Sequence, residues 1–272
     1  MLKQRIITAV ILAAAFFAAQ FGLPTLYFAG LCLVALMAAV YEWGKLTGLH
    51  PAGSLAVAGG VLLIGLVLLF NTGFSAGRGF PDPPVLALCG AASAFWIAIA
   101  PLWLCFGWTT RHPAPMAFLG ALVVLAMWIA MTQLHARSPW LLLAALLVVW
   151  IADTAAYFAG RRFGRRKLAP AISPGKSWEG VYGALAAVLV YAVLLSLFSP
   201  LGSHAGFWRP LLVAFALALV LVSVVGDLFE SLLKRHAGVK DSGRVLPGHG
   251  GVLDRIDALT AVLPLAALAY LA

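Results

Sequence analysis

Nine apolar stretches follow one another along this chain of 272 residues and constrain its fold more than any other feature. A helix needs about 20 apolar residues to cross a bilayer, and most of the stretches approach or exceed that length. Charged residues make up 10% of the chain, against about 25% in soluble domains. We therefore predict an all-α, polytopic integral membrane protein with about nine transmembrane helices. The stretches lie near residues 5–22, 24–44, 53–71, 83–107, 114–133, 139–160, 178–198, 208–233 and 256–272.

The basic residues in the loops predict how these helices are oriented. Lys and Arg accumulate on the cytoplasmic side of membrane helices. With a cytoplasmic N-terminus, fourteen loop Lys and Arg residues fall inside and three outside, which predicts an N-in, C-out protein. The first stretch, preceded by Lys3 and Arg5, also has the form of a secretory signal peptide, but the equally apolar stretches that follow favour an uncleaved first span.

The composition argues against several other functions. The net charge is +9, but the basic residues are too sparse and too interrupted by apolar stretches for nucleic-acid binding, so we expect them to face anionic headgroups or phosphate. The three cysteines lie singly in apolar stretches, which predicts packed thiols rather than disulfides or zinc ligands. The sequence has no internal repeat of the kind found in inverted-repeat transporters.

Charged residues are concentrated in the second part of the chain. Residues 153–257 contain 7 of the 9 acidic and 12 of the 18 basic residues. We therefore divide the chain into an N-terminal transmembrane scaffold, residues 1–140, and a C-terminal transmembrane catalytic region, residues 141–272. The scaffold is rich in small residues that permit close helix packing, and we expect it to face lipid and other helices.

A polar segment closes the eighth apolar stretch. Asp227, Glu230, Ser231 and Lys234 have the spacing i, i+3, i+4 and i+7, which places them on one face of a helix. A carboxylate facing lipid costs a few kcal/mol, so Asp227 should face a partner, water or an ion. The alternative is purely structural: Asp227 contacts Ser231, and Lys234 reaches the membrane interface.

A loop rich in Gly and Pro then leads to two more carboxylates, Asp254 and Asp257. With the spacing i and i+3 they can share one face of the following helix, or they can simply cap it. Gly250 and Gly251 allow the backbone to approach a ligand and to point N–H groups at phosphate.

This arrangement favours a magnesium site. Mg²⁺ takes one or two carboxylates together with phosphate oxygens and water, and Asp227 with Asp254 would supply such a pair. Basic residues around the pair would stabilise phosphoryl oxygens, which indicates phosphoryl or nucleotidyl transfer at the inner face of the membrane. These basic residues are Lys234, Arg235, Lys240, Arg244 and Arg255.

A second polar block precedes the seventh apolar stretch. Ser173 followed by Pro174 predicts a helix N-cap with proline at the first helical position, and the N-terminus of such a helix favours anions. Lys176 and Glu179 would then point into the same cytoplasmic space as the first block. The five bases between residues 161 and 167 mainly anchor the helix at the cytoplasmic side.

The sequence then resembles a known family. The run from Ser231 to Asp257, SLLKRHAGVKDSGRVLPGHGGVLDRID, closely resembles the signature of phosphatidate cytidylyltransferases, also called CDP-diacylglycerol synthases. Residues 153–164 and 167–180 resemble the family too, although the family often has a basic residue at 175 and Thr at 177, where this chain has Gly and Ser. The resemblance covers about residues 150–260, and the first 140 match in hydropathy alone.

The resemblance implies transfer of the cytidylyl group of CTP to phosphatidate, giving CDP-diacylglycerol and pyrophosphate at the cytoplasmic face of a bacterial inner membrane. It implies Mg²⁺ as the cofactor, as one ion or two and with or without a monovalent cation, and a homodimer in contact with membrane lipid. The implied catalytic residues are Asp227, Asp254, Lys234, Arg235, Lys240, Asp241, Arg255 and Asp257, of which Asp227 and Asp254 bind the metal. The implied substrate-binding residues are Asp153, Lys167, Ser173, Lys176, Ser177, Glu179, Ser231, His249, Gly250 and Gly251.

Two other functions stay open at this point. A related CTP-dependent lipid kinase would transfer the γ-phosphoryl group to a polyprenol-type alcohol and release CDP instead of pyrophosphate. A cation-coupled transporter would use Asp153 and Asp227 as relay carboxylates, although the clustering of bases with acids in the loops disfavours it. Asp153 also has a structural alternative, a hydrogen bond to Thr154 or Tyr157 within the helix packing.

Overall fold

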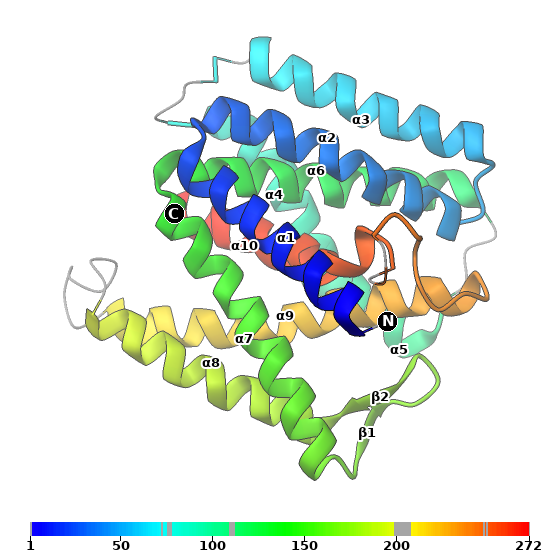
Figure 1. The fold of residues 1–272 in the computed structure, drawn as a ribbon, viewed down its shortest axis with the longest axis vertical. Helices are drawn as coiled ribbons and strands as arrows, with labels where there is room; N and C mark the ends of the chain where they lie inside the picture. The colour runs from blue at the N-terminus through cyan, green and yellow to red at the C-terminus, as the bar shows by residue number, and fades with distance from the viewer. Residues whose placement is uncertain are drawn as a thin grey trace.

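The computed structural model describes residues 2–71, 73–74, 78–108, 112–198, 208–246, 248 and 250–271, and helices dominate this part (Figure 1). The all-α fold class is therefore confirmed, with one short hairpin added. The helices are α1 (Leu2–Gly22), α2 (Thr25–Leu46), α3 (Pro51–Asn71), α4 (Asp82–Ala94), the π-helical turn η1 (Phe95–Ile99), α5 (Ala100–Phe106), α6 (Pro113–Arg137), α7 (Pro139–Phe163), α8 (Trp178–Phe198), α9 (Trp208–His236), the 3₁₀ turn η3 (Leu253–Arg255) and α10 (Asp257–Leu271). The strands are β1 (Lys167–Ala169) and β2 (Ser173–Ser177).

Seven helical segments in the described ranges are long and apolar enough to cross a membrane, which supports a polytopic membrane protein. One of them, Asp82–Phe106, consists of α4, η1 and α5 in succession. Two shorter apolar helices, Ile7–Gly22 and Asp257–Leu271, lie near the first and last predicted stretches. Each of these segments matches one of the predicted apolar stretches, whereas the number of crossings and the N-in, C-out orientation stay predictions.

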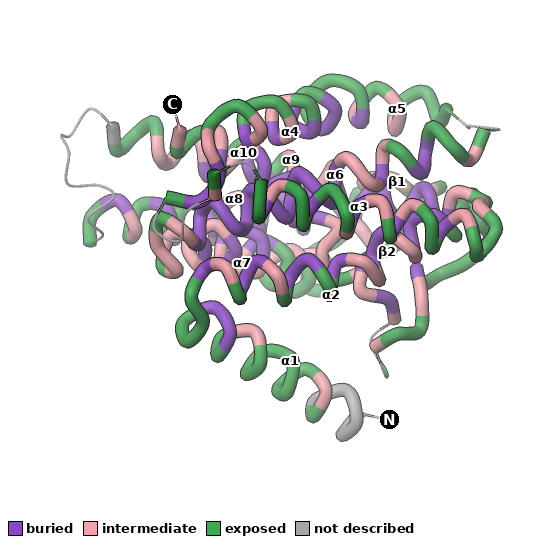
Figure 2. Tube along the Cα trace, turned by 90° about the horizontal axis from the view of Figure 1, so that it is seen from above, coloured by how far each residue is buried: buried purple, intermediate pink, exposed green. Residues whose placement is uncertain are grey.

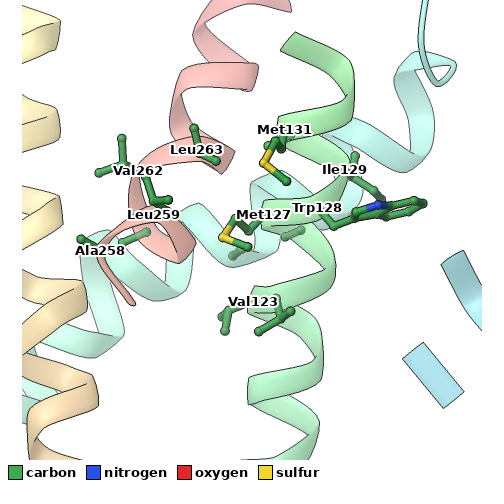
Figure 3. Close-up of a cluster of buried hydrophobic side chains, with 14 of the residues drawn as sticks. Val123, Met127, Trp128, Ile129, Met131, Ala258, Leu259, Val262 and Leu263 are labelled. Carbon is green, nitrogen blue, oxygen red and sulfur yellow. The ribbon is translucent and has the colours of Figure 1, made fainter. Parts of the chain in front are cut away.

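Helix α6 forms the centre of the molecule. Every residue from Val123 to His135 is buried, and the helix packs against α2, α3, α4, α7 and α10. Where α6 meets α10, Met127 points toward Leu259 within a cluster of buried apolar side chains (Figure 3). Exposed residues gather on peripheral helices such as α1, as expected for surfaces that face lipid (Figure 2).

Two glycines permit the close helix contacts that position the site. Gly120 of α6 leaves room for the ring of Trp43, whose indole N–H donates to the carbonyl of Met116 at 2.9 Å. Gly226 of α9 lies against the carbonyl of Asp257, so a larger side chain there would push α10 away. The C-terminal half of α9 therefore contacts the first turn of α10.

The segment between α7 and α8 corrects one prediction. The expected helix start at Ser173 and Pro174 is wrong, because residues 173–177 are extended in β2 and pair in antiparallel fashion with β1. Helix α8 begins only at Trp178. Ser177 has the capping position instead, since its Oγ accepts a hydrogen bond from the N–H of Gly180 at 3.2 Å.

Candidate active site

The polar face predicted on α9 is present. Lys234 donates to Glu230, one turn earlier, at 2.5 Å, and Ser231 Oγ lies 3.4 Å from Asp227 Oδ1. Lys234 also donates to Asp254 Oδ1 on η3 at 2.8 Å, although its side chain is only 13% exposed. Lys234 therefore joins two carboxylates from separate elements, which goes beyond the structural alternative of a lysine that reaches the interface.

Asp254 holds the loop that precedes it, residues 237–252, which we call the glycine loop. Its Oδ2 accepts from the backbone N–H groups of Ser242 at 3.0 Å and Gly251 at 2.8 Å. Burial by itself would raise the pKa of Asp254, but the hydrogen bonds from Lys234 and Gly251 outweigh burial and lower the pKa to about 2. The carboxylate is therefore ionised at neutral pH and joins Ser242 to Gly251 within the loop.

The local structure explains why glycine occupies positions in this loop. Gly250 has φ of +83°, and a side chain at this position would also meet the carboxylate of Asp254. The N–H of Gly251, predicted to face a phosphate, donates to Asp254 in this structure. His249, the other predicted substrate contact of the loop, lies outside the described residues.

The β1–β2 hairpin approaches the same face of α9. Lys176 of β2 forms an ion pair with Asp227 Oδ2 at 2.5 Å. Arg235, at the end of α9, donates from Nε to the carbonyl of Ile172 at 3.0 Å. These two contacts bring the second polar block to the first, as the sequence predicts.

Other predicted residues shape the hairpin rather than meet α9. Glu179, at the start of α8, accepts hydrogen bonds from the backbone N–H groups of Arg165 and Arg166 at 3.1 and 3.2 Å. Lys167, opposite Ser177 in the hairpin, is exposed. The structure thus places Glu179 at the base of the hairpin, where it fixes the turn between α7 and β1.

Carboxylates gather around Lys176. Asp227 interacts electrostatically with Asp153 of α7 and with Asp257 of α10, and Lys176 attracts both of these acids. Asp257 also interacts with Glu230, which links this group to Lys234 and Asp254. Among the residues described, the resulting polar network contains five carboxylates and two lysines: Asp153, Asp227, Glu230, Asp254, Asp257, Lys176 and Lys234. Carboxylates outnumber lysines in this network, and a bound cation would offset the repulsion between them.

The residues present fit a metal ion that also binds phosphate. Within the described ranges, no group of three or more His, Cys, Asp or Glu side chains is arranged to hold a metal by itself. Mg²⁺ does not need such a group, because one or two carboxylates with substrate phosphates and water suffice. The side chain of Asp227 is 33% exposed and accessible to an ion, whereas both oxygens of Asp254 already accept hydrogen bonds. An ion shared between Asp227 and Asp254 stays a prediction.

The remaining predicted residues lie around this network. Asp254 and Asp257 do not share a face of one helix as expected, because Asp254 is in η3 and the chain leaves the helical conformation at Ile256 (φ −125°) before α10 begins. Arg235, Lys240, Asp241 and Arg255 are exposed.

Glu42 of α2 is the residue that the sequence analysis missed. It is 2% exposed, and its Oε2 accepts from Ser242 Oγ at 3.1 Å and from the N–H of Leu253 at 2.8 Å. A signal was available, since Glu42 is an acidic residue inside the second apolar stretch, where a carboxylate needs a partner. The N-terminal region therefore contributes a carboxylate that contacts the glycine loop.

Comparisons with known proteins extend the likeness to the whole chain. A family model described as "Cytidylyltransferase family" matches residues 3–272. The chain is 38% identical to a phosphatidate cytidylyltransferase of Haemophilus influenzae, over 97% of this chain and 96% of that protein. It is 39% identical to one of Pseudomonas aeruginosa over 97% and 95%, and 48% identical to one of Staphylococcus epidermidis over 46% of each chain. The similarity thus includes the first 140 residues, beyond the segment that carries the motifs.

Proposed function

The chain belongs to the cytidylyltransferase family, and we propose that its polar network is the place where the cytidylyl group of CTP passes to phosphatidate. The chain is a nucleotidyltransferase that forms CDP-diacylglycerol, since relatives that match it over nearly their full length are phosphatidate cytidylyltransferases. One observation supports the location above all: the ion pair Lys176–Asp227 joins the second polar block to the face of α9 that also carries the Lys234–Asp254 pair.

The reaction brings two anions together. A phosphate oxygen of phosphatidate attacks the α-phosphorus of CTP, the bond from this phosphorus to the bridging oxygen of the β-phosphate breaks, and pyrophosphate leaves. Because the attacking oxygen is already ionised near neutral pH, no general base is required. The site has to compensate negative charge and align the two phosphates.

The cations of the site divide into two groups. Arg235, Lys240 and Arg255 are exposed, and we assign them to phosphate groups of either substrate. Lys176 and Lys234 are held by carboxylates, so their ammonium groups keep fixed positions. Lys234 is the more buried of the two and keeps Asp254 in place, whereas Lys176 is accessible enough to exchange Asp227 for a phosphate.

We propose Mg²⁺, as one ion or two, as the cation that offsets the repulsion between the carboxylates of the network. Asp227 would hold it, with Asp254 and Asp257 close by in the same network, and Asp241 would orient these groups from the glycine loop. When bound, Mg²⁺ would neutralise charge on the triphosphate. The same excess of carboxylates leaves room for a monovalent cation.

We place the site at the cytoplasmic face of a bacterial inner membrane. The apolar helices and the bacterial relatives support a bacterial membrane. A site at the interface meets both substrates, because the phosphatidate headgroup lies there and CTP arrives from water. A midplane site would have to desolvate a triphosphate. We further propose a homodimer, with residues 141–272 carrying most of the site.

Labelled CTP tests this function against the lipid-kinase alternative. The purified protein is incubated in vesicles containing phosphatidate with CTP labelled at either the α- or the γ-phosphorus, with and without Mg²⁺. We expect the α-label in a lipid product and the γ-label in pyrophosphate. Appearance of the γ-label in lipid, with release of CDP, would identify a kinase instead.

A further inference from the structure

Helix α2 supplies a buried carboxylate to the site from the opposite side of the glycine loop. Glu42 Oε2 accepts hydrogen bonds from the side chain of Ser242 and from the backbone N–H of Leu253. Ser242 lies in the first half of the loop, and Leu253 is the first residue of η3. One oxygen of Glu42 therefore joins the loop to the start of η3.

Glu42 and Asp254 act on the same part of the chain. Asp254 accepts hydrogen bonds from the backbone N–H groups of Ser242 and Gly251. Both carboxylates therefore bind Ser242, and their other partners, Gly251 and Leu253, are close in the sequence. The loop backbone also lies directly against Glu42, since a Cβ added at Gly243 or Gly251 would overlap its carboxylate. The loop is thus held between Asp254 and Glu42.

This position of Glu42 is unfavourable for stability. Its Oε1 is buried and has no hydrogen-bond partner within the part of the chain that the structure describes. A buried carboxylate oxygen without a partner costs free energy, and an apolar side chain would fill the same space without that cost. The two hydrogen bonds to the loop are what distinguishes Glu42 from an apolar packing residue.

We propose that Glu42 is a positioning residue for cytidylyl transfer: it fixes the glycine loop and η3, so that Asp254 stays aligned with Lys234 and the rest of the polar network. This inference rests on the proposed function of that network. Small displacements of a catalytic group lower turnover far more than they lower substrate affinity, and a shift of about 1 Å can cost roughly a hundredfold.

The experiment compares Glu42→Ala and Glu42→Gln with the wild-type protein in phosphatidate vesicles. We expect Glu42→Ala to lower kcat by about ten- to a hundredfold with little change in the KM for CTP. Glu42→Gln keeps one acceptor oxygen for Ser242 and Leu253 and should restore kcat to within about threefold of wild type, a difference of less than 1 kcal/mol. Amide hydrogen exchange of residues 240–253 should be faster in Glu42→Ala than in wild type, and it should not be faster in Glu42→Gln.

Gln133→Ala is the matched control. Gln133 is also fully buried and also accepts from a distant backbone N–H, that of Phe80 at 2.8 Å, but it lies near the opposite end of the α2–α6 pair. We expect this variant to lose stability while it keeps kcat and the exchange of the glycine loop. If it lost as much turnover as Glu42→Ala, a positioning role specific to Glu42 would be refuted.

Ser242→Ala keeps the inference testable if Glu42→Ala does not fold. It removes one of the two hydrogen bonds to Glu42, and we expect kcat to fall by about three- to tenfold, in line with the loss of one modest hydrogen bond. Wild-type kcat in Glu42→Ala or in Ser242→Ala, or equal damage in Glu42→Gln and Glu42→Ala, would overturn the inference. A wild-type protein that makes no CDP-diacylglycerol would overturn the proposed function, and the inference would fall with it.

Discussion

Helix α10 belongs to two regions that differ in their physical chemistry. Its first two turns place Leu259 and Leu263 beside Met127 and Met131 of α6 in an apolar contact (Figure 3). Its first residue, Asp257, lies in the polar network with Asp227, Glu230 and Lys176. One short helix therefore carries a packing surface and part of a charged site a few residues apart.

This difference indicates which region contributes to stability and which to turnover. Apolar contacts have no direction, so a side chain of similar volume can replace another at little cost. The ion pairs of the polar network each have a specific donor and acceptor, and removing one member leaves the other without its partner. Substitutions in the apolar region should therefore change stability, and substitutions in the network should change turnover.

Asp227→Asn should have the largest effect on turnover. It removes the accessible carboxylate that pairs with Lys176 and that we assign to the metal, and loss of such an electrostatic group typically costs about a hundred- to a thousandfold. The measurement is kcat in vesicles, alongside the Tm of the purified protein. Asp82→Asn, at an exposed acid in the first turn of α4, should behave as wild type. Full Mg²⁺-dependent activity in Asp227→Asn would refute the assignment.

Asp254→Asn should lower turnover by about a hundredfold, because the loop loses a charged anchor, and it should also change the response to acid. The pKa of Asp254 is about 2 in the folded protein, below the ordinary value of 3.8. Ionised Asp254 therefore stabilises the fold above about pH 4, and this stabilisation disappears as the pH falls through 2. The Tm difference between wild type and Asp254→Asn should shrink over that range, and a constant difference would contradict the role of the charge.

Lys176→Met should have an intermediate effect. It removes the cation between the hairpin and α9 and leaves Asp227 without its ion pair, for which we expect kcat to fall by about tenfold. Lys45→Met, at an exposed lysine of α2 whose ammonium lies over the Tyr41 ring, removes the same charge outside the network and is the control. Equal activity of the two variants would show that the contact between Lys176 and Asp227 is not part of the site.

Met127→Ala should have the smallest effect on turnover. It opens a cavity in the apolar contact between α6 and α10, and such truncations cost about 2–5 kcal/mol of stability. The Tm should fall, while kcat per folded molecule stays at the wild-type value. A loss of turnover in the folded fraction would mean that the two regions of α10 do not act separately.

Sequence reasoning identified the helices because their signals are local. An apolar stretch long enough to cross a bilayer and the spacing of Asp227, Ser231 and Lys234 can both be read without knowledge of distant contacts. The hairpin was missed for the opposite reason. Ser173 before Pro174 has the pattern of a helix start. These residues are extended instead because they pair with β1, a contact that the local sequence does not reveal.

The same distinction applies to the site. The residues of the two polar blocks could be named, but their pairing could not, because Lys176 meets Asp227 and Lys234 meets Asp254 only in the folded chain. Glu42 is the extreme case, since it contacts Ser242 and Leu253 some two hundred residues later in the sequence. A single acid in an apolar stretch indicates a buried partner without saying which one.

Binding of Mn²⁺, a spectroscopic substitute for Mg²⁺, tests most directly whether the acid-rich end of α9 exists to hold a cation with the nucleotide. Electron paramagnetic resonance of the purified protein with CTP would count free and bound Mn²⁺ in wild type, Asp227→Asn and Asp82→Asn. We predict at least about tenfold weaker binding in Asp227→Asn, a loss of about 1.4 kcal/mol, and no change in Asp82→Asn. Equal affinity in all three proteins would contradict the account.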